Sequence, residues 1–133
     1  MNRKEVQEQF NRRPRNLLLA TSDRKGKVNV AVYGSPKMID EETVVLATRE
    51  CRSYRNLREN PSAVMLVTEV GEIGRQTKGL RLYLELVAAE TEGALLEGFR
   101  KDVAGRAGRE AAQAISAAIR FKVTEVRPIV DQK

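Results

Sequence analysis

Histidine and tryptophan are absent from the 133-residue sequence, and cysteine occurs once, at Cys51. Without histidine there is no imidazole to act as a general base, a proton shuttle or a metal ligand. One cysteine cannot form an internal disulfide, and it leaves a structural zinc site without enough ligands. The sequence also lacks a Walker-type GxxxxGK[ST] motif and a GxGxxG motif after a strand. The side chains alone are therefore poorly equipped for catalysis.

Long apolar segments are missing as well. No apolar run approaches the roughly 18 residues that a membrane-spanning helix needs. The first 16 residues, MNRKEVQEQFNRRPRN, are charged throughout and contain no apolar signal core. Together with the single cysteine, which suits a reducing compartment, these features predict a cytoplasmic protein with no membrane segment. No linker-like stretch interrupts the sequence, which predicts one domain over residues 1–133.

Positive charge is concentrated in three segments. The chain carries 24 basic and 18 acidic residues, which gives a net charge of +6. Residues 1–16 have five basic and two acidic groups, residues 49–58 have four and one, and residues 71–81 have three and one. Because the rest of the chain is slightly acidic, this distribution favours a local anion over a polyanion that grips the whole surface.

Period-two alternation dominates the sequence. In KVNVAVYG, residues 27–34, three valines alternate with other residues, which predicts a half-buried strand with the valines on one face. Similar or β-branched runs predict further strands, and amphipathic or alanine-rich runs predict helices. The expected strands are 16–22, 43–48, 62–70, 79–90 and 119–130, with a short extended piece at 37–39; the expected helices are 3–12, 51–59 and one or two within 93–117. Six or seven strands with hairpin-length links predict an antiparallel barrel or sandwich with short helices.

Four arginines occur in ten positions where one predicted strand ends and a helix begins. They belong to the stretch ATRECRSYRNLRENP, residues 47–61. A helix N-terminus has unpaired backbone N–H groups and a positive partial charge, which suits a phosphate group. Arg52 could add a bidentate guanidinium, and the hydroxyls of Thr48 and Ser53 could donate hydrogen bonds. The alternative is a solvated helix face on which the arginines form surface ion pairs of little energetic value.

The residues around this stretch resemble a known family. Their order is strand LLLATS, a turn with glycine, strand VNVAVYGSP, an acidic turn, strand VVLAT, then CRSYRNLRENP and strand AVMLV. Over about residues 15–92 this order resembles the flavin-binding split β-barrel family related to pyridoxamine 5'-phosphate oxidase. The resemblance implies a mainly β (α+β) fold, an antiparallel six- to seven-stranded split β-barrel with short helices. It also implies a homodimer that binds flavin mononucleotide (FMN) in the clefts between subunits.

The same resemblance implies a set of flavin-binding residues. Arg52 matches the phosphate-binding arginine of the family, and Ser53 lies where the family has lysine or threonine. Residues 32–35 lie where the family's backbone runs along the isoalloxazine edge, residues 47–48 match the strand end beside the phosphate, and residues 78–79 resemble a strand start that approaches the flavin. The implied set is Val32, Tyr33, Gly34, Ser35, Ala47, Thr48, Arg52, Ser53, Lys78 and Gly79. No catalytic residue and no metal ligand is assigned.

Departures from the family limit the chemistry that the resemblance implies. The true oxidase is longer and has a C-terminal substrate-binding segment with arginine and histidine, whereas this sequence has no histidine and ends in VRPIVDQK. We therefore do not expect oxidation of pyridoxamine phosphate. Serine instead of lysine at position 53 also removes one positive charge from the phosphate site.

The expected cofactor is FMN in preference to a deazaflavin or FAD. The expected function is a flavin-dependent oxidoreductase or an electron-transfer protein that acts on a small molecule or a nicotinamide, with the redox chemistry supplied by the cofactor. Two alternatives stay open. One is a basic β-barrel module that binds nucleic acid, which the net charge permits and the aromatic content of 5% disfavours. The other is a carrier that holds flavin without turnover.

Overall fold

Alternating strands and short helices make up residues 1–131, the part of the chain that the computed structural model describes. In chain order the elements are α1 (Arg3–Asn11), β1 (Arg15–Ser22), β2 (Val28–Val32), β3 (Lys37–Met38), β4 (Thr43–Thr48), α2 (Arg52–Glu59), β5 (Ser62–Glu69), β6 (Gly79–Glu90), α3 (Ala94–Ala107), α4 (Arg109–Gln113) and β7 (Ala117–Pro128). The predicted strands and helices are confirmed, with shifts of one or two residues at their ends. The alanine-rich region forms two helices, separated by Gly108.

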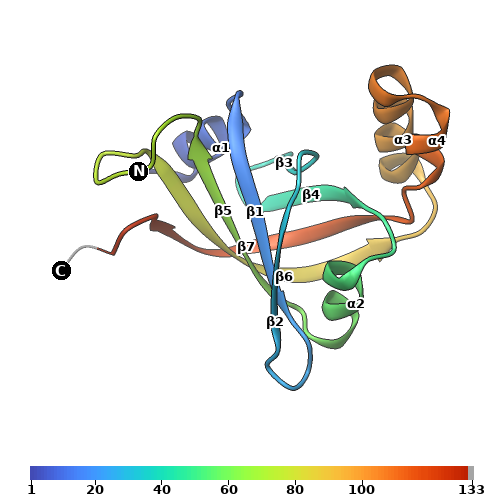
Figure 1. The fold of residues 1–133 in the computed structure, drawn as a ribbon, viewed down its shortest axis with the longest axis horizontal. Helices are drawn as coiled ribbons and strands as arrows, with labels where there is room; N and C mark the ends of the chain where they lie inside the picture. Colours follow the sequence, from blue (N-terminus) through green and yellow to red (C-terminus); the bar gives the residue numbers. More distant parts are fainter. Residues whose placement is uncertain (132–133) are drawn as a thin grey trace.

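The strands form one antiparallel sheet in the order β2-β1-β5-β6-β7-β4-β3. The sheet curls strongly, so that β2 and β1 cross in front of β6 and β7 (Figure 1). The two longest strands, β6 and β7, have register shifts at Tyr83/Leu84 and Leu86/Ala88. Such irregularities bend a strand and increase its twist, which is how a sheet curls toward a barrel. The expected mainly β, antiparallel fold with short helices is confirmed.

The hydrophobic core lies inside the curl. Its largest fully buried side chains come from the strands and from α1: Phe10, Phe121, Leu19, Leu46, Met65 and Leu82. The leucine face of β6 belongs to this core, because Leu80, Leu82 and Leu84 are all buried. A smaller cluster on the other side of β4 and β7 packs against Leu96 and Phe99 of α3. None of the described helices is both long and apolar enough to cross a membrane.

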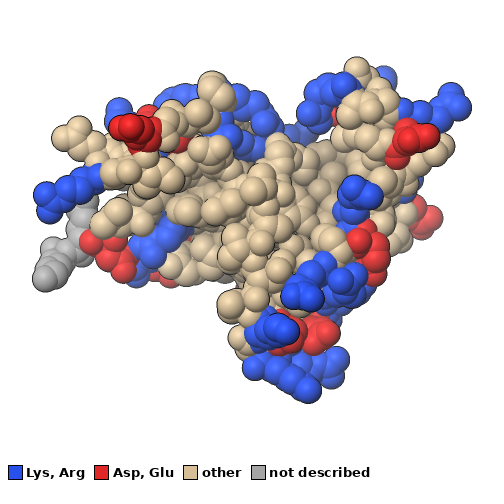
Figure 2. Space-filling model, viewed as in Figure 1, with Lys and Arg blue, Asp and Glu red and all other residues tan. Residues whose placement is uncertain are grey.

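The strand β2 alternates as predicted, but its apolar side chains are the exposed ones, which is the reverse of an ordinary half-buried strand. Its valines, Val28, Val30 and Val32, are 74%, 60% and 79% exposed, whereas Asn29 and Ala31 between them are half-buried. The reason is that β2 is an edge strand whose polar face is turned toward α2. The surface over β2 is largely uncharged in Figure 2, above the basic turn that joins β1 to β2. We call Val28, Val30 and Val32 the valine stripe.

One glycine is required by close packing between strands. A Cβ atom at Gly79 would lie 2.4 Å from the carbonyl oxygen of Val67 and 2.9 Å from Cγ2 of Ile129, whereas a Cβ atom at Gly98 in α3 would meet nothing within 4 Å. Gly79→Ala should therefore destabilise the protein by about 1–3 kcal/mol, the usual cost of overpacking. Gly98→Ala, the matched control, should stabilise it by up to about 1 kcal/mol, because glycine is unfavourable inside a helix. Urea unfolding of both variants measures the difference; equal effects would contradict the packing explanation.

Candidate functional site

The connection between β2 and β3 crosses the end of β4. Tyr33 begins this connection, and its backbone N–H donates to the Leu17 carbonyl at 3.2 Å. The Tyr33 hydroxyl lies 2.8 Å from Oγ1 of Thr48, the last residue of β4, and 3.4 Å from Sγ of Cys51. Since β2 and β4 lie near opposite ends of the strand order, this contact joins the two sides of the curled sheet.

Ser35 makes a second contact with the end of β4. Its Oγ accepts a hydrogen bond from the Ala47 N–H at 3.0 Å and donates to the Ala47 carbonyl at 3.2 Å. The Ser35 hydroxyl thus pairs with both backbone groups of Ala47, as a neighbouring strand would do. Together, Tyr33 and Ser35 hold Gly34 between them against Ala47 and Thr48. The structure therefore brings together the two predicted segments, residues 32–35 and 47–48.

The helix α2 starts four residues after Thr48 and is attached to the β1–β2 hairpin. Ser53 is buried, and its Oγ accepts a hydrogen bond from Nδ2 of Asn29 at 3.3 Å. One turn later, Nδ2 of the buried Asn56 donates to Oγ1 of Thr21 at 3.1 Å. The helix ends at Glu59, because Pro61 disfavours helical backbone in Asn60, which is extended. These contacts hold the first turn of α2 beside Thr48 and Tyr33.

The four arginines around α2 have different environments. Arg58 pairs with Glu50 at 2.6 Å and lies over the ring of Tyr54, with its guanidinium carbon 4.1 Å from the ring centroid. The side chains of Arg49, Arg52 and Arg55 are exposed and make no ion pair or hydrogen bond with residues 1–131. Arg58 thus belongs to a surface ion pair, whereas the exposed side chains of Arg49, Arg52 and Arg55 are compatible with a solvated face and with an anion site. Basic side chains gather over α2 and the nearby β1–β2 turn in Figure 2.

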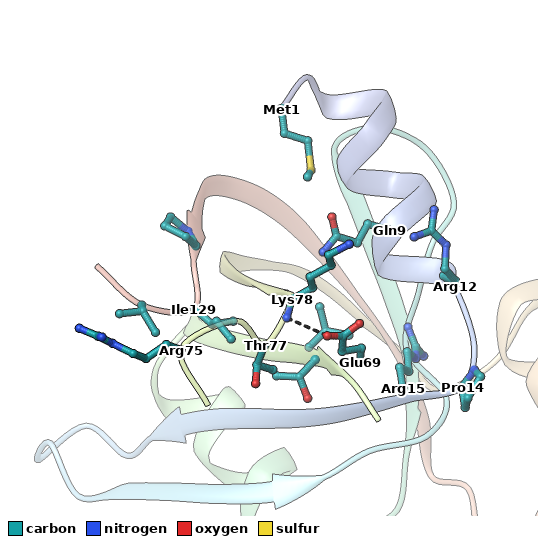
Figure 3. Close-up of a pocket in the computed structure, with 15 residues that line it drawn as sticks. Met1, Gln9, Arg12, Pro14, Arg15, Glu69, Arg75, Thr77, Lys78 and Ile129 are labelled. Carbon is teal, nitrogen blue, oxygen red and sulfur yellow. Dashed lines mark hydrogen bonds between the residues drawn. The ribbon is translucent and has the colours of Figure 1, made fainter. Parts of the chain in front are cut away.

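Lys78 and Gly79 lie elsewhere in the chain. They line a cavity between α1, the β5–β6 loop and the end of β7 (Figure 3). The strand packing described above accounts for Gly79 without a ligand. One residue connects this cavity with the β2–β3 connection: Arg15 lines the cavity, and its guanidinium donates to the carbonyls of Gly34, at 3.4 Å, and Pro36. Within one chain these two predicted residues do not join the cluster around Tyr33.

Two residues of the cluster were missed by sequence reasoning. Neither Asn29, which lies between two valines of β2, nor Cys51, which precedes α2, was among the residues expected at the site. Asn29 instead holds Ser53, and the half-buried Cys51 contacts both Tyr33 and Thr48. A polar residue on the inner face of β2 was the available signal for Asn29. No pattern in the sequence indicated the contacts of Cys51, because they depend on curling of the sheet.

The sequence matches the model of the family described as Pyridoxamine 5'-phosphate oxidase over residues 3–129. The chain belongs to this family. No curated protein matches the sequence significantly. Among solved structures, an FMN-binding protein from Syntrophomonas wolfei subsp. wolfei is similar, with 25% identity and a TM-score of 0.77, over 88% of this chain and 78% of the other.

Two further structures share the fold at lower identity. HutZ, the heme storage protein from Vibrio cholerae, is 19% identical with a TM-score of 0.67, over 96% of this chain and 95% of its own. An F420 reductase is 18% identical with a TM-score of 0.65, over 90% of this chain and 94% of its own. The fold of the family therefore occurs with different ligands and does not by itself determine which one this chain binds.

The start of α2 fits the phosphate group of the family's flavin. Cys51, the residue before the helix, makes no regular side-chain capping hydrogen bond, and its thiol is only a weak acceptor for the backbone N–H groups of Ser53 and Tyr54, which an anion could replace. The unpaired guanidinium of Arg52 follows directly, and the buried hydroxyls of Thr48 and Ser53 lie alongside. The carboxylate next to the site, on Glu50, is neutralised by Arg58. The donor set thus suits a dianion, although serine at position 53 supplies no charge.

The Tyr33 and Cys51 side chains influence each other's protonation. Burial, together with the hydrogen bond to Cys51, raises the pKa of Tyr33 to about 12, so its hydroxyl stays a hydrogen-bond donor at neutral pH. Burial alone would raise the pKa of the Cys51 thiol. Hydrogen bonds from the hydroxyls of Tyr33 and Thr48, and from backbone N–H groups at the start of α2, outweigh burial and lower that pKa below its ordinary value.

This balance predicts how Cys51 reacts. Alkylation of Cys51 by iodoacetamide should have a midpoint pH below that of an ordinary thiol, because the thiolate accepts these hydrogen bonds. Tyr33→Phe removes one donor and should raise the midpoint. Tyr83→Phe is the control, because its hydroxyl makes no hydrogen bond with a described residue. The single cysteine allows mass spectrometry to follow the reaction without ambiguity. The same midpoint in wild type and Tyr33→Phe would refute the assigned contact.

Proposed function

We propose that this chain binds FMN with its phosphate at the start of α2, and that it uses the flavin as a redox cofactor in a homodimer. One observation carries the proposal: the contacts of Tyr33 with Thr48 and of Ser35 with Ala47 hold the β2–β3 connection beside the unpaired Arg52. A phosphate seat and a stretch of exposed backbone thus lie next to each other. Similarity to the FMN-binding protein from Syntrophomonas wolfei supports this choice of flavin.

The proposed site uses the residues that the fold gathers. Arg52, Ser53 and Thr48 would hold the phosphate, and the backbone of residues 32–35 would lie along the edge of the ring. Val32 and Gly34 are exposed, so the backbone around them is accessible. Lys78 and Gly79 are left out of the proposed flavin site, because they line a different cavity in the same chain.

The chain's own part in the chemistry would be binding and orientation. The flavin supplies transfer of hydride or single electrons when it is bound. The sequence has no histidine, and the Tyr33 hydroxyl stays protonated at neutral pH, so the cluster offers hydrogen-bond donors in preference to a base. This arrangement favours a flavin-dependent oxidoreductase or electron-transfer protein over an enzyme with its own acid–base pair. Anaerobic mixing with a nicotinamide donor distinguishes such a protein from a flavin carrier.

The nucleic-acid alternative gains no support from the aromatic side chains. Single-strand binding by small β-barrels depends on exposed aromatic rings that stack on bases. All three phenylalanines and Tyr54 are buried here, and Tyr33 and Tyr83 are half-buried. The basic residues therefore lack the stacking platforms that such a function requires.

A homodimer is the proposed assembly because β2 leaves an apolar surface uncovered. The valine stripe lies on an edge strand, and its three side chains are more than half exposed. A contiguous apolar surface of this kind is typical of a protein interface. The leucine face of β6 does not supply such a surface, because Leu80, Leu82 and Leu84 belong to the core. The stripe is adjacent to residues 32–35, so a second chain seated on it would lie beside the proposed flavin.

One prediction concerns the phosphate group of FMN. Arg52→Ala should weaken FMN binding by about 1.5–3 kcal/mol, the scale of a hydrogen bond to a charged group. Riboflavin, which lacks the phosphate, should bind wild type much more weakly and should be nearly insensitive to the substitution. Titration of apoprotein, followed by flavin fluorescence, measures both ligands.

Arg55→Ala is the matched control for this experiment. It removes the same charge from the same helix, one turn further along, and its side chain is also exposed and unpaired within the described residues. It should change FMN affinity only through weak long-range attraction, which added salt screens. Equal affinity of wild type for FMN and riboflavin would exclude a phosphate site at α2.

Another prediction concerns the assembly of the protein into a dimer. Val30→Asp places a charge in the centre of the valine stripe, and it should shift the protein from dimer to monomer, because an unpaired carboxylate is costly to bury in an interface. Sedimentation equilibrium should give twice the chain mass of 14.9 kDa for wild type and the chain mass for the variant. Val87→Asp, at an exposed valine on β6, is the control and should stay dimeric. A monomeric wild type with saturating FMN would contradict the proposed assembly.

A further inference from the structure

The cavity that contains Lys78 has walls from three segments that are distant in the sequence. It has a volume of about 500 Å³, within the usual range for small-molecule sites of roughly 300–1,000 Å³. Gln9 and Arg12 come from the end of α1, Arg75 and Thr77 from the β5–β6 loop, and Ile129 from the segment after β7. Figure 3 shows these side chains around the opening, with α1 above it and the loop below.

The charges around this cavity are mostly positive and mostly unpaired. Arg12, Arg75 and Lys78 are exposed and form no ion pair within residues 1–131. Arg15 donates only to the backbone carbonyls of Phe10, Gly34 and Pro36. Burial and the nearby Arg13 lower the pKa of Arg15 to about 10, as expected for a cation that has no anionic partner.

A single carboxylate opposes these four cations. Glu69 lines the same cavity, and its Oε1 accepts a hydrogen bond from the backbone N–H of Lys78 at 3.1 Å. That bond holds the carboxylate against the β5–β6 loop (Figure 3). The excess of positive charge therefore remains available to a ligand.

The rest of the cavity wall is apolar, with one buried hydroxyl. Val67, Pro128, Ile129 and Val130 supply the apolar surface. Thr68 also lines the cavity, and its side chain is 8% exposed. The cavity therefore combines a cationic opening with a largely apolar wall, as small-molecule sites often do.

We propose that this cavity binds a small amphipathic organic anion, which is a carboxylate or phosphate ester with an apolar body. Arg12, Arg75 and Lys78 bind the acidic group at the opening, since guanidinium groups match both carboxylate and phosphate. The apolar body lies against Val67 and Ile129. The site is separate from the start of α2 and does not depend on the binding of flavin there.

The test uses 8-anilinonaphthalene-1-sulfonate as the probe, an anion with an apolar ring system whose fluorescence reports binding. Arg75→Gln/Lys78→Gln should lower its affinity at least about tenfold, which corresponds to the loss of one charge-assisted hydrogen bond. Lys101→Gln/Arg106→Gln makes the same change in net charge on exposed residues of α3 and should bind like wild type. Octanoate or phenyl phosphate should displace the probe, and which of the two does so identifies the acidic group. Octanol should not.

Two results would overturn the proposal. One is equal affinity of the two double variants for the probe, which would mean that the cavity does not bind it. The other is a loss of FMN affinity in Arg75→Gln/Lys78→Gln as large as its loss of probe affinity, which would make the cavity part of the flavin site. If the probe binds as expected and FMN binds nowhere, the proposed flavin function fails while the anion site stands.

Discussion

Two side-chain contacts across the ends of the strand order hold the curled sheet closed beside the candidate site. Tyr33 reaches Thr48, and Ser35 takes the place of a strand partner for Ala47. In a flat sheet, β2 and β4 would lie five strand spacings apart in this order, or about 24 Å. The curl removes that separation. The attachment of α2, the position of Arg52 and the surroundings of Cys51 all depend on this closure.

The sequence predicted the elements well and their surroundings less well. Local patterning located β1, β2, β4, β5, β6 and β7 to within two residues, through alternation in some strands and through runs of β-branched apolar residues in others. It gives the period of a strand but does not say which face is buried, since that depends on what lies opposite. For this reason the valines of β2 are exposed although their pattern is regular. The leucines of β6 are buried, which the same kind of pattern left open.

The sequence predicted the part of the candidate site that a local motif specifies. It did not predict the part that depends on contacts between distant residues. Arg52, Ser53 and the proline that ends α2 form a local motif, and the helix begins where the motif places it. The Asn29–Ser53 and Tyr33–Cys51 contacts connect residues 24 and 18 positions apart. Gly79 is a different case. Its small size is needed between Val67 and Ile129, so packing accounts for a glycine that was expected beside a ligand.

The short, uncovered strand β2 also affects the chain before it finds a partner. A free strand edge with an apolar outer face is a template to which strands from other molecules can add, which is the first step of aggregation. The turn that precedes β2 carries Arg24, Lys25 and Lys27, and β2 itself has only five residues. Like charges at this end repel a second copy that approaches edge to edge, and the short strand offers few backbone groups to pair with. Charged residues beside an exposed apolar strand, as in this basic turn, are a common natural protection against such association.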